Sequence, residues 1–220
     1  MSRLTIALAT IAAAAAAAAC SDISSPIRSN VYDWRLVATK QTGGFDTLSF
    51  QWPASNQPVK YWVADTLDMP ARVQHALDVW QGVFLYREFR GTVVADSSTA
   101  DVIVRIGSPP ASPGVPLGAF APDCRGATDL DIRPGDEGHL FLPVRVYIEP
   151  KFDGTTAGES DCLDLTSIHE IGHSIGIWNH SPDPSDIMYG DPIVSAPSER
   201  DRETIERIYH VTPNVVPVTR

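Results

Sequence analysis

Three histidines and one glutamate between residues 169 and 180 are the residues of this chain whose types and spacing could do chemistry. The segment runs His-Glu-Ile-Gly-His-Ser-Ile-Gly-Ile-Trp-Asn-His and holds three of the six histidines of the 220-residue chain. On a helix, His169 and His173 differ by about 40° in direction and about 6 Å in height, so both rings can bind one ion. Glu170 points about 100° away, which suits a base better than a ligand. The spacing therefore predicts a metal site with a general base beside it.

The third ligand of this site must come from beyond the helix. Catalytic zinc commonly takes three protein ligands and leaves a fourth position to water. On a continuous helix, His180 would lie about 16 Å along the axis from His169, too far to bind the same ion. We therefore expect the helix to end at Gly176, because glycine adopts the left-handed conformation that terminates helices. His180 then enters from the returning loop.

The chemistry that these residues favour is metal-assisted peptide hydrolysis. One catalytic zinc ion would activate a water molecule and polarise a peptide carbonyl, with Glu170 as general base and a protein or peptide as substrate. The alternatives are a metal-storage or structural cluster, or histidines on a buried polar face. Structural zinc usually has four Cys and His ligands, and no fourth ligand is evident in the sequence.

The sequence from His169 to Tyr189 resembles the metzincin metallopeptidases, and their matrixin branch most closely. After Gly176 and His180, the shared pattern continues as Ser-Pro-Asp-Pro-Ser-Asp-Ile-Met-Tyr. The resemblance implies that Met188 is the Met-turn residue, which supports the three imidazoles without binding the ion. It also implies that substrate binds as an added strand along a sheet edge near residues 117–122, and that residues 189–197 wall the specificity pocket.

One position departs from the family pattern. The family places the third histidine three residues after the glycine, where this chain has Asn179, and His180 follows one residue later. Either the loop bulges by one residue and His180 binds the metal, or the amide oxygen of Asn179 faces the metal and activity is impaired. The segment from Ser181 to Tyr189 matches the family only when it is counted from His180, which favours His180.

The rest of the sequence predicts an α+β fold with a partly parallel sheet. Alternating apolar residues on either side of Gly43-Gly44 predict a β-hairpin, and a helix is expected after Pro70. A capping box at Ser198 predicts a last helix that ends near Tyr209, and Gly158 is expected in an irregular connection. Further strands are expected over residues 59–64, 93–94, 102–104 and 140–149.

Together with the resemblance, these elements predict a metzincin-like domain over residues 58–212, followed by a tail over 213–220. Its expected parts are a twisted mixed sheet, a long first helix, the active-site helix, the Met-turn and the C-terminal helix.

The N-terminus has the features of an export signal. Arg3 precedes an uncharged run, Leu4 to Ala19, that is too short and too weakly apolar for a spanning helix. An uncleaved membrane anchor is the alternative. Ala17-Ala18-Ala19-Cys20 resembles the lipobox of bacterial lipoproteins. This resemblance implies a signal peptide over residues 1–19, a lipid on Cys20, and a tether with the hairpin over 20–57. The protein would be exported and anchored to the membrane of the bacterial cell envelope, or extracellular.

Three cysteines are an odd number for an exported protein, and a lipid on Cys20 leaves Cys124 and Cys162 to form a disulfide. That bridge would contribute on the order of 4 kcal/mol in the loop-entropy model. Two free thiols, or Cys124 as a removable zinc-blocking thiol, are the alternatives.

Charge and acidic residues restrict the partners. The net charge of −10 argues against nucleic acid. Acidic side chains between residues 123 and 137 offer oxygen ligands for Ca²⁺, but their spacing is not that of an EF-hand, and a solvated acidic loop is the simpler interpretation. Two other functions stay open: a zinc hydrolase acting on cell-wall peptides, and a non-catalytic surface lipoprotein that uses the same fold for binding. Glu170 favours hydrolysis, since a binding protein needs no general base.

Overall fold

The computed structural model describes residues 28–39, 44–107, 124–133, 135–150 and 156–219 of the chain. The predicted signal peptide, Cys20 and the edge strand expected over 117–122 lie outside these residues. No helix within the described ranges combines the length and the apolar character that a membrane span requires.

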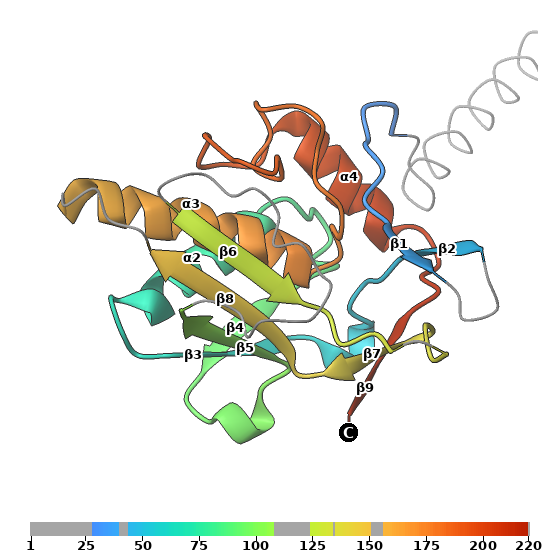
Figure 1. Cartoon of the computed structure of the whole chain (residues 1–220), viewed down its shortest axis with the longest axis horizontal. Helices are drawn as coiled ribbons and strands as arrows, with labels where there is room; N and C mark the ends of the chain where they lie inside the picture. The colour runs from blue at the N-terminus through green and yellow to red at the C-terminus, as the bar shows by residue number, and fades with distance from the viewer. Residues whose placement is uncertain (1–27, 40–43, 108–123, 134, 151–155, 220) are drawn as a thin grey trace, which may run out of the picture.

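A five-stranded mixed sheet with the order β4-β3-β5-β8-β6 forms the centre of the fold (Figure 1). Strands β4, β3, β5 and β8 run parallel to one another, and β6 runs antiparallel to β8 at the edge. A mixed sheet with few helices is compatible with the predicted α+β class. The bounds are β3 Val59–Val63, β4 Gly91–Val94, β5 Val102–Ile106, β6 Cys124–Asp129 and β8 Val144–Pro150.

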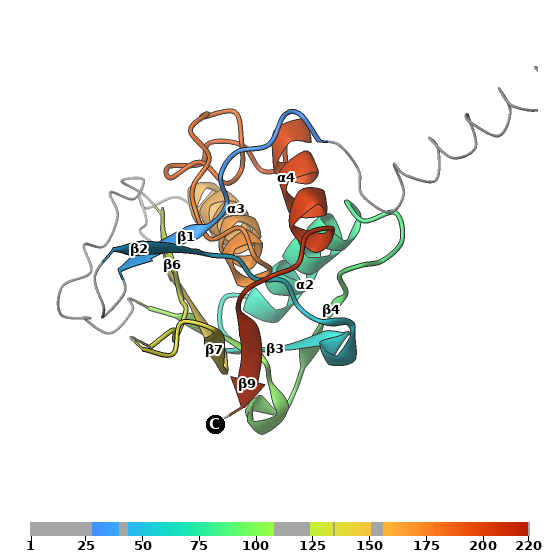
Figure 2. The same ribbon diagram turned by 90° about the vertical axis from the view of Figure 1, so that its right-hand side faces the viewer.

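Two helices, α2 (Met69–Gln81) and α3 (Thr156–Ser174), pack against each other and against strands of this sheet. Figure 2 shows them together with α4 (Glu199–Tyr209) above the strands. The indole nitrogen of Trp80 in α2 donates to the backbone oxygen of Ile168 in α3 at 2.8 Å. This buried bond fixes α2 against the helix that carries two of the predicted metal ligands, His169 and His173.

Helix α4 begins with the predicted capping box. The hydroxyl of Ser198 accepts from the backbone nitrogen of Asp201 at 3.1 Å, and the carboxylate of Asp201 accepts from the backbone nitrogen of Ser198 at 2.9 Å. Two free donors at the helix start are satisfied reciprocally, which is why the helix begins here.

Three expectations about element boundaries were wrong. The single strand expected over 140–149 is two strands, because Pro143, which cannot donate to a ladder, separates β7 (His139–Leu142) from β8. Strand β7 leaves the main sheet and pairs in parallel with β9 (Val216–Thr219), which is formed by residues of the predicted tail. Gly158 lies within α3 and not in an irregular connection.

The residues that precede β3 belong to the same core as the sheet and helices. Strands β1 (Leu36–Thr39) and β2 (Phe45–Leu48) pair antiparallel, within the stretch predicted as a hairpin. Tyr32, Phe50 and Trp52, on either side of this pair, are buried in the central hydrophobic cluster. Two short 3-10 helices, Ala54–Asn56 and Ser97–Thr99, complete the described elements.

Candidate metal centre

The three predicted histidines converge at the C-terminal end of α3. His169 and His173 lie on the last turns of this helix, and His180 lies on the loop that follows it. The Nε2 atom of His173 is 3.0 Å from Nε2 of His169 and 3.2 Å from Nε2 of His180. Within the described part of the chain, these residues form the one group of three potential metal ligands whose ligand atoms all lie within 4.8 Å. The group could hold a metal ion.

Gly176 turns the chain back, as its position in the sequence predicts. Its φ is +129°, and a Cβ atom there would lie 2.5 Å from the backbone oxygen of Phe50. The backbone nitrogen of Gly176 donates to the backbone oxygen of His173 at 3.2 Å. The backbone nitrogen of Ile177 donates to the backbone oxygen of Gly172 at 3.1 Å. This pair of bonds is the Schellman pattern that ends helices at glycine. Both the left-handed backbone and the lack of space require glycine here.

Backbone carbonyls determine which nitrogen of two rings carries the proton. Nδ1 of His169 donates to the oxygen of Ile187 at 2.7 Å, and Nδ1 of His173 donates to the oxygen of Ile177 at 2.5 Å. A neutral imidazole has only one N–H, so each Nε2 keeps a lone pair. These lone pairs face one another with no proton between them. A cation among them would stabilise the arrangement, and the carbonyl contacts are those that orient metal-binding imidazoles.

The histidines are held in the neutral form that binds metals. Burial lowers the pKa of His169 to about 4. Burial and the two neighbouring histidines lower the pKa of His173 well below its ordinary value, and partial burial also lowers the pKa of His180. Since a protonated ring cannot bind a cation, these shifts favour metal binding at neutral pH.

The side-chain amide of Asn179 bonds to backbone groups of Asp33 and His180. Its amide nitrogen donates to the backbone oxygen of Asp33 at 3.0 Å, and its amide oxygen accepts from the backbone nitrogen of His180 at 3.0 Å. The loop brings Nε2 of His180 to His173, while both ends of the Asn179 amide are bonded to backbone groups.

Glu170 is buried between α3 and the edge strand β6. Its side chain accepts from the hydroxyl of Thr128 in β6, with 2.6 Å between Oε2 and Oγ1. The strand approaches so closely that a Cβ at Gly126 would lie 2.6 Å from Cδ of Glu170. Burial raises the pKa of Glu170 to about 8, and the Thr128 hydroxyl opposes this shift. A carboxyl group with such a pKa is suited to take up and release a proton near neutral pH.

Met188 is fully buried against the turn of α3 that carries the two histidines. A Cβ atom at Gly172, which lies between His169 and His173 in sequence, would be 3.1 Å from Cε of Met188. The backbone oxygen of Met188 accepts from the nitrogen of Ser181 at 2.8 Å. These contacts tie the loop after His180 to the helix that carries His169 and His173.

Asp186 and Asp201 hold this loop in place, and neither residue was identified as part of the site from the sequence. Asp201 accepts from the backbone nitrogen of Ile187 at 2.9 Å, so the residue whose carbonyl orients His169 is itself fixed. The buried carboxylate of Asp186 accepts from Ser198 Oγ at 2.6 Å and from Arg200 Nε at 2.8 Å. In the sequence, the capping box indicated that Asp201 helps to start α4, but not that it holds the loop. No sequence pattern indicated a role for Asp186.

The remaining predicted site residues are only partly described. Cys162 is disulfide-bonded. The side chain of Cys124, its predicted partner, lies outside the described part of the structure, as does Cys20, so this pairing and the lipid on Cys20 stay predictions. The described acidic side chains of residues 129–137 form no metal-binding cluster of three or more. In this stretch the carboxylate of Asp136 pairs instead with the ring of His139.

In the comparison with known proteins, no family model and no curated protein matches the chain.

Proposed function

We propose that the protein is a zinc-dependent endopeptidase with a metzincin-like fold of the matrixin type. The observation that carries this proposal is the convergence of three imidazole Nε2 atoms, with the buried Glu170 following His169 directly in the sequence. In this proposal His169, His173 and His180 hold zinc, Glu170 is the general base, and Met188 is the Met-turn residue.

The donor set fits zinc. Around a tetrahedral zinc ion with bonds of about 2.0–2.1 Å, ligand nitrogens lie about 3.3 Å apart. The distances of 3.0 and 3.2 Å between the Nε2 atoms are close to this value. Three protein ligands leave one position for water, which supports a catalytic ion over a structural one.

The residues around the histidines can carry out peptide hydrolysis. Zinc in this site would polarise a peptide carbonyl and lower the pKa of a water molecule toward about 7. Glu170 would accept the proton of the attacking water at a carboxylate oxygen and pass it to the departing amine. The hydroxyl of Thr128 holds this carboxylate in place, and Gly126 leaves room for it.

An extended peptide is the substrate that the edge of the sheet favours. Strand β6 is one of the two edge strands of the sheet, and its residues Gly126 and Thr128 lie against Glu170. A peptide added along this edge would have its main chain close to the base. The stretch that follows Met188 starts next to the metal site, since a Cβ at Gly190 would lie 3.3 Å from Nδ1 of His180. We assign residues 189–197 to the wall of the specificity pocket.

The proposed location is the bacterial cell envelope, with the lipid on Cys20 as the anchor. This part of the proposal rests on the export signal and the lipobox resemblance. The disulfide at Cys162 supports it, because disulfides persist in oxidising compartments.

The experiment that tests the function compares the parent protein with Glu170→Gln. Zinc content is measured by mass spectrometry and hydrolysis is measured with casein and a quenched-fluorescence peptide library. We expect one zinc ion in both proteins and hydrolysis only in the parent. Glu199→Gln, an exposed acidic residue at the start of α4, is the matched control and should retain both properties.

Three outcomes would contradict the proposal. Full hydrolysis by Glu170→Gln would exclude this residue as the base. Cleavage of cell-wall peptides but not of protein by the parent would favour a cell-wall hydrolase. Zinc binding without any hydrolysis would favour a binding lipoprotein.

A further inference from the structure

We propose that the N-terminal segment, residues 28–34, is a positioning element of the metal site that holds His180 through the side chain of Asn179. The inference rests on the metal site of the proposed function, but it does not depend on the reaction that the metal serves. It assigns a role to a segment that lies far from the histidines in sequence.

The segment meets the His180 loop through two consecutive carbonyl groups. The backbone oxygen of Trp34 accepts from the nitrogens of Trp178 and Asn179, at 2.8 and 3.0 Å. The backbone oxygen of Asp33 accepts from the amide nitrogen of Asn179 at 3.0 Å. The other end of the same amide accepts from the nitrogen of His180. Asn179 therefore links the segment directly to the backbone of the third ligand.

His180 depends on such backbone contacts more than the other two ligands do. His169 and His173 lie on a helix, and each donates from Nδ1 to a backbone carbonyl. Among the described residues, Nδ1 of His180 has no carbonyl partner, and His180 lies on the loop after the helix. The position from which its ring reaches the other two ligands therefore depends on the backbone that Asn179 holds.

The same segment also reaches His169 through α4. The hydroxyl of Tyr32 donates to one carboxylate oxygen of Asp201 at 2.9 Å, and the other oxygen accepts from the nitrogen of Ile187. Ile187 in turn accepts from Nδ1 of His169. Tyr32 is only 7% exposed, so this contact lies inside the protein. Two of the three ligands thus have positions that depend on the N-terminal segment.

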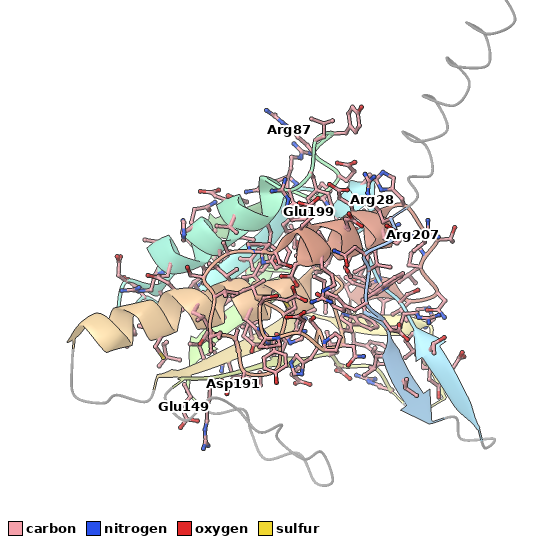
Figure 3. All side chains as sticks on the ribbon, turned by 90° about the horizontal axis from the view of Figure 1, so that it is seen from above. Arg28, Arg87, Glu149, Asp191, Glu199 and Arg207 are labelled. Carbon is pink, nitrogen blue, oxygen red and sulfur yellow. The ribbon has the colours of Figure 1, made fainter. Side chains whose placement is uncertain are left out.

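Helix α4 anchors the segment along its length. Arg28 pairs with Glu206 at 2.8 Å, and the backbone nitrogen of Asn30 donates to Glu203 at 3.0 Å. Figure 3 shows Arg28 near Arg207, at the C-terminal end of α4. From there the segment crosses α4 toward β1 (Figure 2). With Asn179 and His180 it also lines a pocket of about 430 Å³.

The experiment measures metal affinity and not activity. Zinc affinity is determined by competition with a chromophoric chelator, and coordination is followed by the visible absorption of the cobalt-loaded full chain. We expect Asn179→Ala to weaken zinc binding about 10- to 100-fold and to change the cobalt spectrum, as loss of an outer contact to a metal ligand does. Because Asn179 is exposed, the melting temperature of the metal-free protein should change little.

Three further variants complete the test. Asn179→Asp keeps the acceptor for His180 but loses the donor to Asp33, so it should show a smaller loss of affinity. Tyr32→Phe removes only the hydroxyl that contacts Asp201, and it should also weaken zinc binding, which keeps the test valid if Asn179→Ala does not fold. Arg35→Ala is the control, because this exposed side chain pairs with Asp33 without touching the loop.

The outcomes separate this inference from the proposed function. Parent affinity and an unchanged cobalt spectrum in both Asn179→Ala and Tyr32→Phe would overturn the role of the segment while leaving the zinc site intact. A parent chain that binds no zinc would overturn the proposed function itself, and this inference with it.

Discussion

The carboxylate of Asp201 lies 2.9 Å from the backbone nitrogen of Ile187, the residue whose carbonyl oxygen accepts from His169. A side chain of α4 therefore determines the orientation of a histidine on α3. Asp201 also accepts from the nitrogen of Ser198 and from the hydroxyl of Tyr32, so one carboxylate satisfies donors from three segments.

The first prediction concerns this carboxylate. Asp201→Ala leaves three donors without their acceptor, and we expect the free energy of unfolding of the metal-free protein to fall by about 3 kcal/mol. Urea unfolding measures the change, and zinc affinity should fall as well because His169 loses its fixed partner. Arg202→Ala, an exposed change on the same helix, should stay within about 0.5 kcal/mol of the parent. Equal losses in the two variants would show that Asp201 has no special role.

The second prediction concerns the space beside Glu170. Gly126→Ala places a methyl group against the carboxyl of Glu170 and should displace it. Misplacing a catalytic group by about 1 Å can lower the rate of hydrolysis about 100-fold, and we expect zinc to stay bound. Gly138→Ala is the matched control, because its Cβ would meet nothing closer than 3.9 Å. Normal hydrolysis by Gly126→Ala would argue against the proposed position of the base.

The third prediction is a pH dependence at the loop that follows His180. Hydrogen bonds from Ser185, followed by Arg200, lower the pKa of Asp183 from its ordinary 3.8 to about 2. A carboxyl group with a lowered pKa stabilises the fold fully above the unfolded value, and this contribution disappears as the pH falls toward about 2. Asp183→Asn should therefore melt below the parent at pH 6, and the difference should shrink between about pH 4 and pH 2. A difference that grows on acidification would contradict the assignment.

The histidine cluster could be predicted from the sequence because its geometry is local. Two histidines four residues apart share a helix face in any helix, and Gly176 predicts the turn that returns His180. The choice between Asn179 and His180 could not be made from local rules alone. It depends on the carbonyl of Asp33, which lies more than a hundred residues earlier in the chain.

Features that depend on long-range pairing were missed for the same reason. Thr128 and Gly126 contact Glu170 only because β6 pairs antiparallel with β8 at the edge of the sheet. Strand β9 exists only through its partner β7, and nothing in its own residues indicates this pairing. Gly158 is a poor helix former, yet α3 includes it. For β6 and β9, tertiary contacts outweigh the local preference of the residues.

The central claim is that His169, His173 and His180 together hold one zinc ion. Anomalous diffraction at the zinc absorption edge, from crystals of the purified protein, tests it most directly. We predict a single strong peak about 2.0–2.1 Å from the Nε2 atoms of all three histidines. A peak bound to Asn179 in place of His180, or no peak at this cluster in zinc-containing crystals, would contradict the account.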